Sequence, residues 1–590
     1  MKKFRIFSLL LAVCLILSLL GACGSNGSTA ASTTEEEATS TAEAPSSAAE
    51  TEEAPAQETE ETDAAIQTSA EETTEAGSVE VAEEAVEAIP EPEPFTLPIT
   101  DEETTLTLWM RTEPFTIAYP DITMDTVTFY REMAERTNVN VEITGVIAFQ
   151  AAENFNLMVA SGDYCDMIGR FATFYTAGID AGIDNGVIID LSEYFDDYMV
   201  NYDYALKTND TFRRDCTSAE GRVGAANTLY EITEGEQIGP CIRQDWLDEL
   251  GLDLPVTYDD YYDVLKAFQD AGHDGALALR WNGVNSGNYL IAGFDAAGFF
   301  DDTEVSVPFL NIDGEVKFGA IEDGYRDYLE LMNQWYSEGL IYQDFYSLDT
   351  STYPENLSNG TFGIAVVDRG QMTSTQLSLE AAQPGADLVG LKDARQNAED
   401  TLHIQYVTYN VSDGYSISTS CQDVETAAKY LDYLYTDEGS VLAGYGVEGE
   451  GLEYDAEGNP QFSDLVLHND DYPCTPAMVK YATYGCPGIY DGSRYMGAYD
   501  ERTASAVELW GEDDQEYLYP TNAGLTVDES DVYSNIMSEV RTYVQEMTLK
   551  FITGAESMDQ WDTYVQTIED MGIADAIEIK QDALDRYLAH

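Results

Sequence analysis

Residues 105–169 alternate strand patterns with helical ones, and this alternation narrows the folds open to the chain. Alternating apolar side chains in TLTLWM (105–110) predict a strand, and VNVEITGV (139–146) predicts a second strand after a helical stretch. Another helical stretch, a Ser-Gly-Asp turn and a short strand at 166–169 follow. Strands and helices alternating at this spacing form right-handed βαβ units, so we expect a parallel sheet covered by helices.

The later segments continue the same mixture of elements. Thr257 stands where the N-cap of a helix would, with Asp260 three residues further on. FGIAVV (362–367) and GYSIS (414–418) predict buried strands, and the C-terminal part is mostly helical, with an apolar face that begins at Val532. The body of the chain, about 490 residues, is long enough for two lobes or more.

The N-terminus resembles a bacterial lipoprotein signal. A basic start precedes an apolar run, Ile6 to Leu20, that is too short to be an ordinary membrane span. The run ends in LGAC, which resembles a lipobox. That resemblance implies cleavage before Cys23 and attachment of diacylglycerol to its thiol, which would anchor the protein to the membrane. The alternative is a plain secretory signal with a chance cysteine.

Residues 24–97 consist almost entirely of Glu, Thr, Ala, Ser and Pro, without Lys or Arg. Such a segment buries too little apolar surface to offset its ordering entropy, so we expect a disordered, self-repelling tether. Some 75 flexible residues reach roughly 50 Å. A spacer with no role beyond crossing the cell wall is an equally good interpretation.

The charge balance excludes two classes of partner. The chain has 110 acidic and 27 basic residues, a formal net charge of −83, and most of the acidic residues lie beyond the tether. A surface this negative repels nucleic acid and anionic lipid, so we expect no nucleic-acid partner. The charge does not by itself indicate a cationic ligand, because distributed acidic residues usually form a solvated face.

The cysteines do not indicate a function. Cys14 would leave with the signal, and no CxxC pair or zinc-type spacing occurs among the others. Cys474 and Cys486 could pair in an oxidising compartment, but we expect small buried thiols.

Six stretches of the body resemble, in order, the extracellular solute-binding proteins of family 1, the lipoprotein branch found with sugar importers. These stretches are ASGDYCDMI (160–168), NGVIIDLSEYFDDY (185–198), IRQDWLDELGLDLPVTYDDYYDVLKAF (242–268), MNQWYSEGLI (332–341), YLDYLYTDEGSVLAGYGVEGEG (430–451) and KFITGAESMDQWDTYV (550–565). The resemblance implies an α/β, two-lobed periplasmic-binding-protein type 2 fold with an interlobe cleft that closes by hinge motion.

The expected division of the chain follows from this resemblance. It comprises a signal peptide at 1–22, a tether at 23–97, the first lobe at 98–235 and 414–485, and the second lobe at 236–413 and 486–590.

The sequence offers no metal site or catalytic motif. Some relatives carry a calcium loop after the helix that would end here at Phe268, but QDAGHDGALAL (269–279) and DAEGN (455–459) lack the required ligand spacing. Motifs of the GxSxG, HExxH, Walker and GxGxxG types are missing. We therefore expect no metal, no cofactor and no catalytic residues.

Candidate ligand contacts follow from the rule that solutes bind beyond the carboxyl ends of strands and at lobe crossings. Trp109 and Arg111 end the first strand and, by resemblance to maltose-binding proteins, face the cleft. The full set is Trp109, Arg111, Arg170, Phe171, Glu236, Gln237, Trp281, Asn285, Tyr289, Arg369, Tyr406, Arg494 and Tyr495. For each, the alternative is an aromatic residue in the core or an arginine in an ion pair. Trp246, Trp335 and Trp561 lie in amphipathic helices, where we expect core packing.

The function implied by the resemblance is solute capture for an ABC importer. We expect a monomer, lipid-anchored on the outer face of the cell membrane, that delivers a carbohydrate to the permease subunits. Six Trp and many Tyr permit stacking on sugar rings, but clefts for peptides or other metabolites use aromatic residues too. A binder of another solute and a surface glycoside hydrolase are the alternatives.

The lipobox interpretation predicts the behaviour of one variant. Cys23→Ser removes the thiol that would carry the lipid, so the protein should move from the membrane fraction to the medium. Retention of the variant in washed membranes, at the level of the unaltered chain, would refute the anchor.

Overall fold

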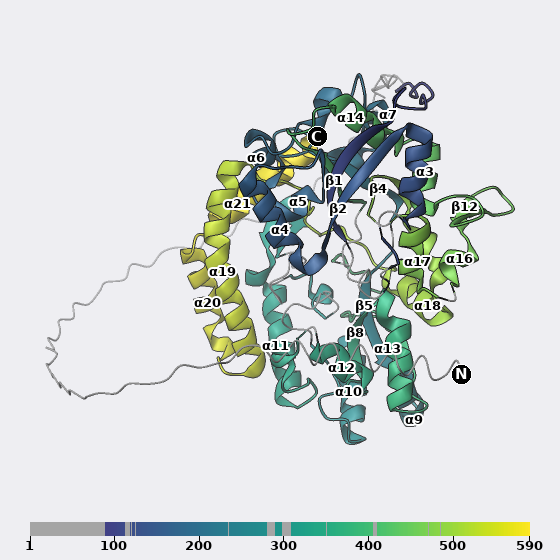
Figure 1. The fold of residues 1–590 in the computed structure, drawn as a ribbon. Coiled ribbons are helices and arrows are strands. Elements are labelled where there is room, and N and C mark those ends of the chain that lie inside the picture. The colour runs from purple at the N-terminus through teal and green to yellow at the C-terminus, as the bar shows by residue number, and fades with distance from the viewer. Residues whose placement is uncertain are drawn as a thin grey trace, which may run out of the picture. The chain divides into compact units, whose positions relative to one another are not determined.

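The structure is a computed structural model (Figure 1). It describes residues 89–112, 119, 121–123, 126–233, 235–279, 290–297, 308–349, 351–404, 410–469, 471–483 and 485–590. Elements of the first lobe are β1 (Thr104–Thr112), α3 (Thr128–Thr137), β2 (Val139–Ile147), α4 (Ala148–Ser161), β3 (Met167–Gly169), α5 (Phe171–Phe174), α6 (Gly178–Asp184), α7 (Val200–Thr208), α8 (Asp210–Cys216), β4 (Ala226–Ile232), β10 (Val411–Ile417), α14 (Val424–Tyr433), α15 (Asp437–Tyr445), β11 (Leu452–Tyr454), β12 (Pro460–Phe462), α16 (Asp464–Leu467), α17 (Cys474–Tyr481) and β13 (Gly488–Asp491).

The second lobe is built from later segments of the chain. Its elements are β5 (Ile238–Arg243), α9 (Gln244–Leu250), α10 (Tyr258–Asp270), β6 (Phe309–Ile312), β7 (Glu315–Phe318), α11 (Asp323–Ser337), α12 (Thr352–Ser358), β8 (Ile364–Asp368), α13 (Arg369–Ala382), β9 (Leu388–Gly390), α18 (Glu501–Trp510), α19 (Val527–Thr553), α20 (Trp561–Asp570) and α21 (Ile573–Ala589).

A six-stranded sheet forms the centre of the first lobe, in the order β13-β4-β10-β3-β1-β2. β1 pairs in parallel with β2 and β3, as the strand–helix alternation predicted, and β10 runs antiparallel between β3 and β4. Both faces of β1 are buried: Leu108 belongs to one apolar cluster and its neighbour Trp109 to another. Successive side chains of a strand point to opposite faces, so the two clusters lie on opposite sides of the sheet.

A smaller sheet, β8-β5-β9, forms the centre of the second lobe, with β5 antiparallel to both neighbours. The apolar face of helix α10 belongs to the same cluster as β5 and β8, and the helix begins with the predicted capping box. The Thr257 side chain accepts from the Asp260 backbone N–H at 3.2 Å, and the Asp260 carboxylate accepts from the Thr257 N–H at 2.9 Å. The predicted core tryptophans Trp246, Trp335 and Trp561 are all buried in the same large cluster.

The chain passes between the lobes after β4, after β9 and after β13. β13 pairs with β4 in the large sheet, whereas α18 packs against β5 and β9. The predicted division into lobes therefore stays a proposal, with its last boundary moved from residue 486 to a point after Asp491.

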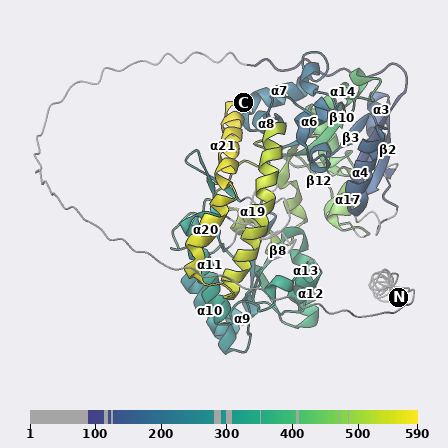
Figure 2. The same ribbon diagram turned by 90° about the vertical axis from the view of Figure 1, so that its left-hand side faces the viewer.

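Two of the C-terminal helices, α19 and α21, contact both lobes (Figure 2). α19 packs against α11 of the second lobe and reaches α6 of the first, while α21 packs against β7 and reaches α8. Val540 and Val544 lie on the buried face of α19, as predicted, but Val532, expected on that face, is 48 % exposed. Within the described part of the chain, no helix is both long enough and apolar enough to cross a bilayer.

The end of the predicted tether packs on the first lobe. The Phe95 ring lies 5.3 Å from the Tyr433 ring, and Leu97 contacts the same apolar cluster. These two apolar side chains are why residues 95–97 belong to the body rather than to the tether. The signal peptide, Cys23 and the tether up to residue 88 lie outside the described residues.

All six cysteines of the body are thiols in this structure, Cys474 and Cys486 included. Burial raises the pKa of Cys216 and of Cys486 to about 12. These thiols therefore stay protonated at neutral pH, as expected of small buried side chains.

The burial of Trp109 predicts a stability effect. Its side chain is 2 % exposed, so Trp109→Ala should lower the free energy of unfolding by about 3–5 kcal/mol through loss of packing. Phe149→Ala is the matched control, because this ring is 70 % exposed on α4 and its loss should cost at most about 0.5 kcal/mol. Urea denaturation measures both, and equal effects would contradict the core assignment.

Candidate ligand-binding cavity

A cavity of about 660 Å³ lies between the two lobes. The segment after β3, from Arg170 to Asp180, forms one wall together with the end of α8 and the first residues of β4 and β10. The opposite wall consists of residues 521–525, Ser530 near the start of α19 and Lys580 of α21. The cavity therefore opens at the carboxyl end of β3, where open α/β sheets place their ligands.

The lining is rich in hydrogen-bonding side chains. Its polar members are Arg170, Thr173, Thr176, Asp180, Asp215, Thr217, Ser218, Asn227, Ser412, Thr521, Asn522, Ser530 and Lys580. Hydroxyl and amide groups both donate and accept hydrogen bonds. A wall of this composition suits a solute that carries many hydroxyl groups.

The two carboxylates in the lining are already engaged by the protein. Asp180 accepts from the Nε of Arg222 at 2.8 Å and from the Ser218 hydroxyl at 2.6 Å. Burial raises the pKa of Asp215, while hydrogen bonds from Tyr587 and Asn522 act in the opposite direction. The Tyr587 hydroxyl, on α21, donates to Asp215 at 2.7 Å and thereby joins the two lobes at the cavity.

Two predicted ligand contacts, Trp109 and Phe171, belong instead to the core. Both pack against Phe155 of α4, and the Trp109 indole N–H donates to Asn154 at 2.8 Å. The strand places Trp109 on the sheet face that α4 covers, so its ring is not presented to a solute. The expectation of a cleft-facing Trp109 is corrected accordingly.

The remaining described candidates are dispersed, and only Arg170 lines the cavity. Arg111 is half-buried at the end of β1. The Arg494 guanidinium stacks on Tyr490 at 4.5 Å and donates to the Gly444 carbonyl at 3.1 Å, which holds it against the first lobe.

Glu236, Gln237 and Arg369 come together where the chain enters the second lobe. The Gln237 carbonyl accepts from the Arg369 N–H at 2.8 Å, and the Arg369 guanidinium donates to the Gly235 carbonyl at 3.1 Å. Glu236 is 3 % exposed, and burial together with the nearby Asp393 raises its pKa to about 8. Burial and the charge of Asp513 likewise raise the pKa of Asp393 to about 7.

Four candidates, Trp281, Asn285, Tyr289 and Tyr406, lie outside the described residues. Tyr495 lies in a short 3-10 helix, Gly492–Ala498. These five positions stay predictions.

The cavity residues Asn227, Ser412, Asn522, Ser530 and Lys580 were not predicted. The Thr526–Glu529 capping box marks the start of α19 in the sequence, and Ser530 follows it directly. That signal locates a helix start, but only the packing of α19 and α21 beside α6 and α8 brings Ser530 and Lys580 to the first lobe.

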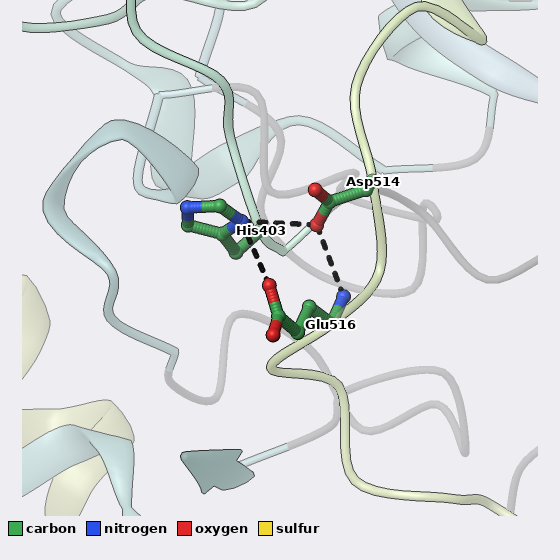
Figure 3. A group of neighbouring side chains, drawn as sticks. All are labelled: His403, Asp514 and Glu516. Carbon is green, nitrogen blue, oxygen red and sulfur yellow. Dashed lines mark hydrogen bonds and ion pairs between the residues drawn. The ribbon is translucent and has the colours of Figure 1, made fainter. Parts of the chain in front are cut away.

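One group of side chains has donors suited to a metal ion, His403, Asp514 and Glu516 (Figure 3). The His403 Nδ1 lies 3.0 Å from the Asp514 carboxylate and 3.7 Å from that of Glu516. Burial opposes the charged ring, but the hydrogen bond and charge of Asp514 outweigh it and raise the pKa of His403. Backbone hydrogen bonds join the same two segments, with Asp514 N–H donating to Leu402 and Tyr517 N–H to His403. In this structure the three side chains act as ion pairs that hold two loops together.

The two lobes, the interlobe cavity and the repeated chain crossings define a solute-binding protein of the periplasmic-binding type. The sequence model of the bacterial extracellular solute-binding proteins matches residues 123–441. The chain belongs to this family.

Two curated relatives resemble most of the chain. The fructooligosaccharide ABC transporter substrate-binding protein FusA of Streptococcus pneumoniae is 25 % identical over 78 % of this chain and 87 % of its own length. Lipoprotein LipO of Bacillus subtilis is 24 % identical over 60 % of this chain and 73 % of its own length.

A solved structure supports the two-lobed fold. The extracellular solute-binding protein from Bifidobacterium longum subsp. infantis superposes with a TM-score of 0.64, at 19 % identity, over 84 % of this chain and 100 % of that chain.

The raised pKa of Glu236 predicts how stability depends on pH. The folded protein keeps a proton that the unfolded chain loses above about pH 4.5, so the free energy of unfolding should fall as pH rises from 5 to 8.5. Glu236→Gln mimics the protonated form and should reduce this fall by on the order of 4 kcal/mol. The exposed Glu457→Gln is the control, and urea denaturation at both pH values is the measurement. Parallel pH curves for all three proteins would contradict the assignment.

Proposed function

We propose that this protein is the substrate-binding component of an ABC importer and that it captures an oligosaccharide in the interlobe cavity. The observation that carries the proposal is a cavity lined by polar side chains from both lobes at the carboxyl end of β3. A solute held there contacts both lobes at once. Its binding energy therefore favours the closed form, which is the form that a permease would recognise.

The carbohydrate class is supported by two independent arguments. The lining offers hydroxyl, amide and charged groups rather than an apolar slot, and sugar hydroxyls need such partners when they leave water. FusA, which resembles 78 % of this chain, is named for fructooligosaccharide transport.

The cellular setting belongs to the same proposal. The family is extracellular, and the LGAC run would place a lipid on Cys23, so that the protein acts as a tethered monomer on the outer face of the membrane. Its task is to bind and release a solute, not to make or break bonds. The carboxylates of the cavity fit this role, because Asp180 and Asp215 are occupied by protein donors.

A cavity-filling variant tests where the solute binds. Ser530→Trp places a bulky ring at the cavity wall and should abolish the thermal stabilisation that a bound oligosaccharide produces. That stabilisation amounts to about 2.7 kcal/mol when the ligand is at 100 times its Kd. The screen covers neutral and acidic glycans together with peptides.

The matched control is Ser534→Trp, one turn further along α19 and exposed. It should retain the full ligand-induced shift. Thermal stabilisation by peptides alone would show that the protein binds another class of solute. Release of sugar products by the pure protein would favour a hydrolase.

A further inference from the structure

Among the residues that the structure describes, unpaired cations are rare, and two of them line the interlobe cavity. Acidic residues outnumber basic ones by 110 to 27. Most lysines and arginines that the structure describes lie within 4.0 Å of a carboxylate. Within that part of the chain, the side chains of Arg170, Arg214 and Lys580 make neither an ion pair nor a hydrogen bond. Arg170 and Lys580 line the cavity, and Arg214 directly precedes its lining residue Asp215.

Arg170 is fixed at the wall of the first lobe. It directly follows β3, its backbone N–H donates to the Gly414 carbonyl at 2.8 Å, and its φ of 58° places it in the left-handed region. A residue other than glycine seldom adopts this conformation. The guanidinium is therefore carried by a well-defined backbone position at the carboxyl edge of the sheet.

Lys580 is held at the opposite wall by aromatic rings. Its ammonium lies 4.0 Å from the centre of the Tyr519 ring, 5.7 Å from that of Tyr533 and 6.0 Å from that of Phe309. Burial lowers its pKa to about 8, so the group is still charged at neutral pH. Cation–π contacts offset part of the cost of withdrawing the charge from water, but they do not neutralise it.

The carboxylates of the cavity do not neutralise these cations. Asp180 pairs with Arg222, and Asp215 accepts from Tyr587. Arg170 on the first lobe and Lys580 on the second therefore both lack an ion pair with any described residue at the interlobe cavity, although the protein is rich in acidic residues. A buried or half-buried charge without a partner is costly, and an anionic ligand would remove that cost.

We propose that the solute is an acidic oligosaccharide, whose uronate carboxylates bind to Arg170 from the first lobe and to Lys580 from the second. This inference rests on the proposed function and narrows it to a ligand class. Charge-assisted hydrogen bonds to a carboxylate are roughly twice as strong as neutral ones. Placed on facing lobes, the two cations couple recognition of the acid to closure of the cleft.

The test compares trimers of galacturonate, mannuronate and guluronate with their methyl esters, which keep the sugar backbone but lose the charge. Calorimetry should show at least one free acid binding tenfold or more tightly than its ester. Arg170→Gln and Lys580→Gln should each weaken binding of that acid at least tenfold and change binding of the ester less than threefold. Arg170→Lys and Lys580→Arg keep the charge and should retain binding.

The controls are Arg326→Gln and Lys550→Gln, two exposed cations in helical ion pairs with Glu330 and Glu546. They should bind the acid like the unaltered protein. Equal affinity for acids and esters, or binding of neutral glycans alone, would overturn the acidic ligand while leaving oligosaccharide capture in place. Failure of every glycan, acidic or neutral, to bind would overturn both proposals.

Discussion

The hydrogen bond from Tyr587 to Asp215 connects the last helix of the chain to α8 of the first lobe, and the cavity exists because of contacts of this kind. Arg213 reinforces it by donating to the backbone carbonyl of His590 at 2.5 Å. These contacts bring α19 and α21, which pack on the second lobe, to α6 and α8 of the first lobe (Figure 2). The two lobes keep separate apolar clusters, and the contacts named here join them through hydrogen bonds.

In this arrangement, one set of segments forms the cores of the lobes and another set lines the cavity. Buried strands and helices, with their apolar clusters, form two stable bodies. The groups that face the cavity come mainly from loops and from the ends of strands and helices, with Lys580 within α21. The distribution of charge also differs between the cavity wall and the rest of the chain. Acidic residues outnumber basic ones by 110 to 27, yet Arg170 and Lys580 in the cavity wall have no carboxylate of the described chain within 4.0 Å.

Local patterns predicted local structure well. The strands β1, β2 and β3 and the capping box at Thr257 depend on residues close in sequence, and the structure contains them all. Ligand contacts also depend on the direction in which each side chain points. The rule that solutes bind at strand ends placed Trp109 in the cleft, but side-chain alternation turns it toward α4. Arg170 follows the same rule and does line the cavity, because it lies beyond the strand rather than within it.

Other cavity residues had no local signal at all. Lys580 lies on an ordinary amphipathic helix, more than 400 positions from Arg170, and nothing near it in the sequence distinguishes it from a surface lysine. Its significance comes from the aromatic rings around it and from the lack, among the described residues, of a carboxylate within 4.0 Å of its ammonium group. Both are consequences of tertiary packing, so a reading of periodicity and spacing could not reach them.

Cys216 lies at the end of α8, buried and protonated, in the wall of the cavity. The thiol packs in the apolar cluster of the first lobe, beside Tyr202. The rate at which an alkylating reagent modifies it therefore reports how often this part of the cavity wall opens, and it can be read without attaching a probe to the protein.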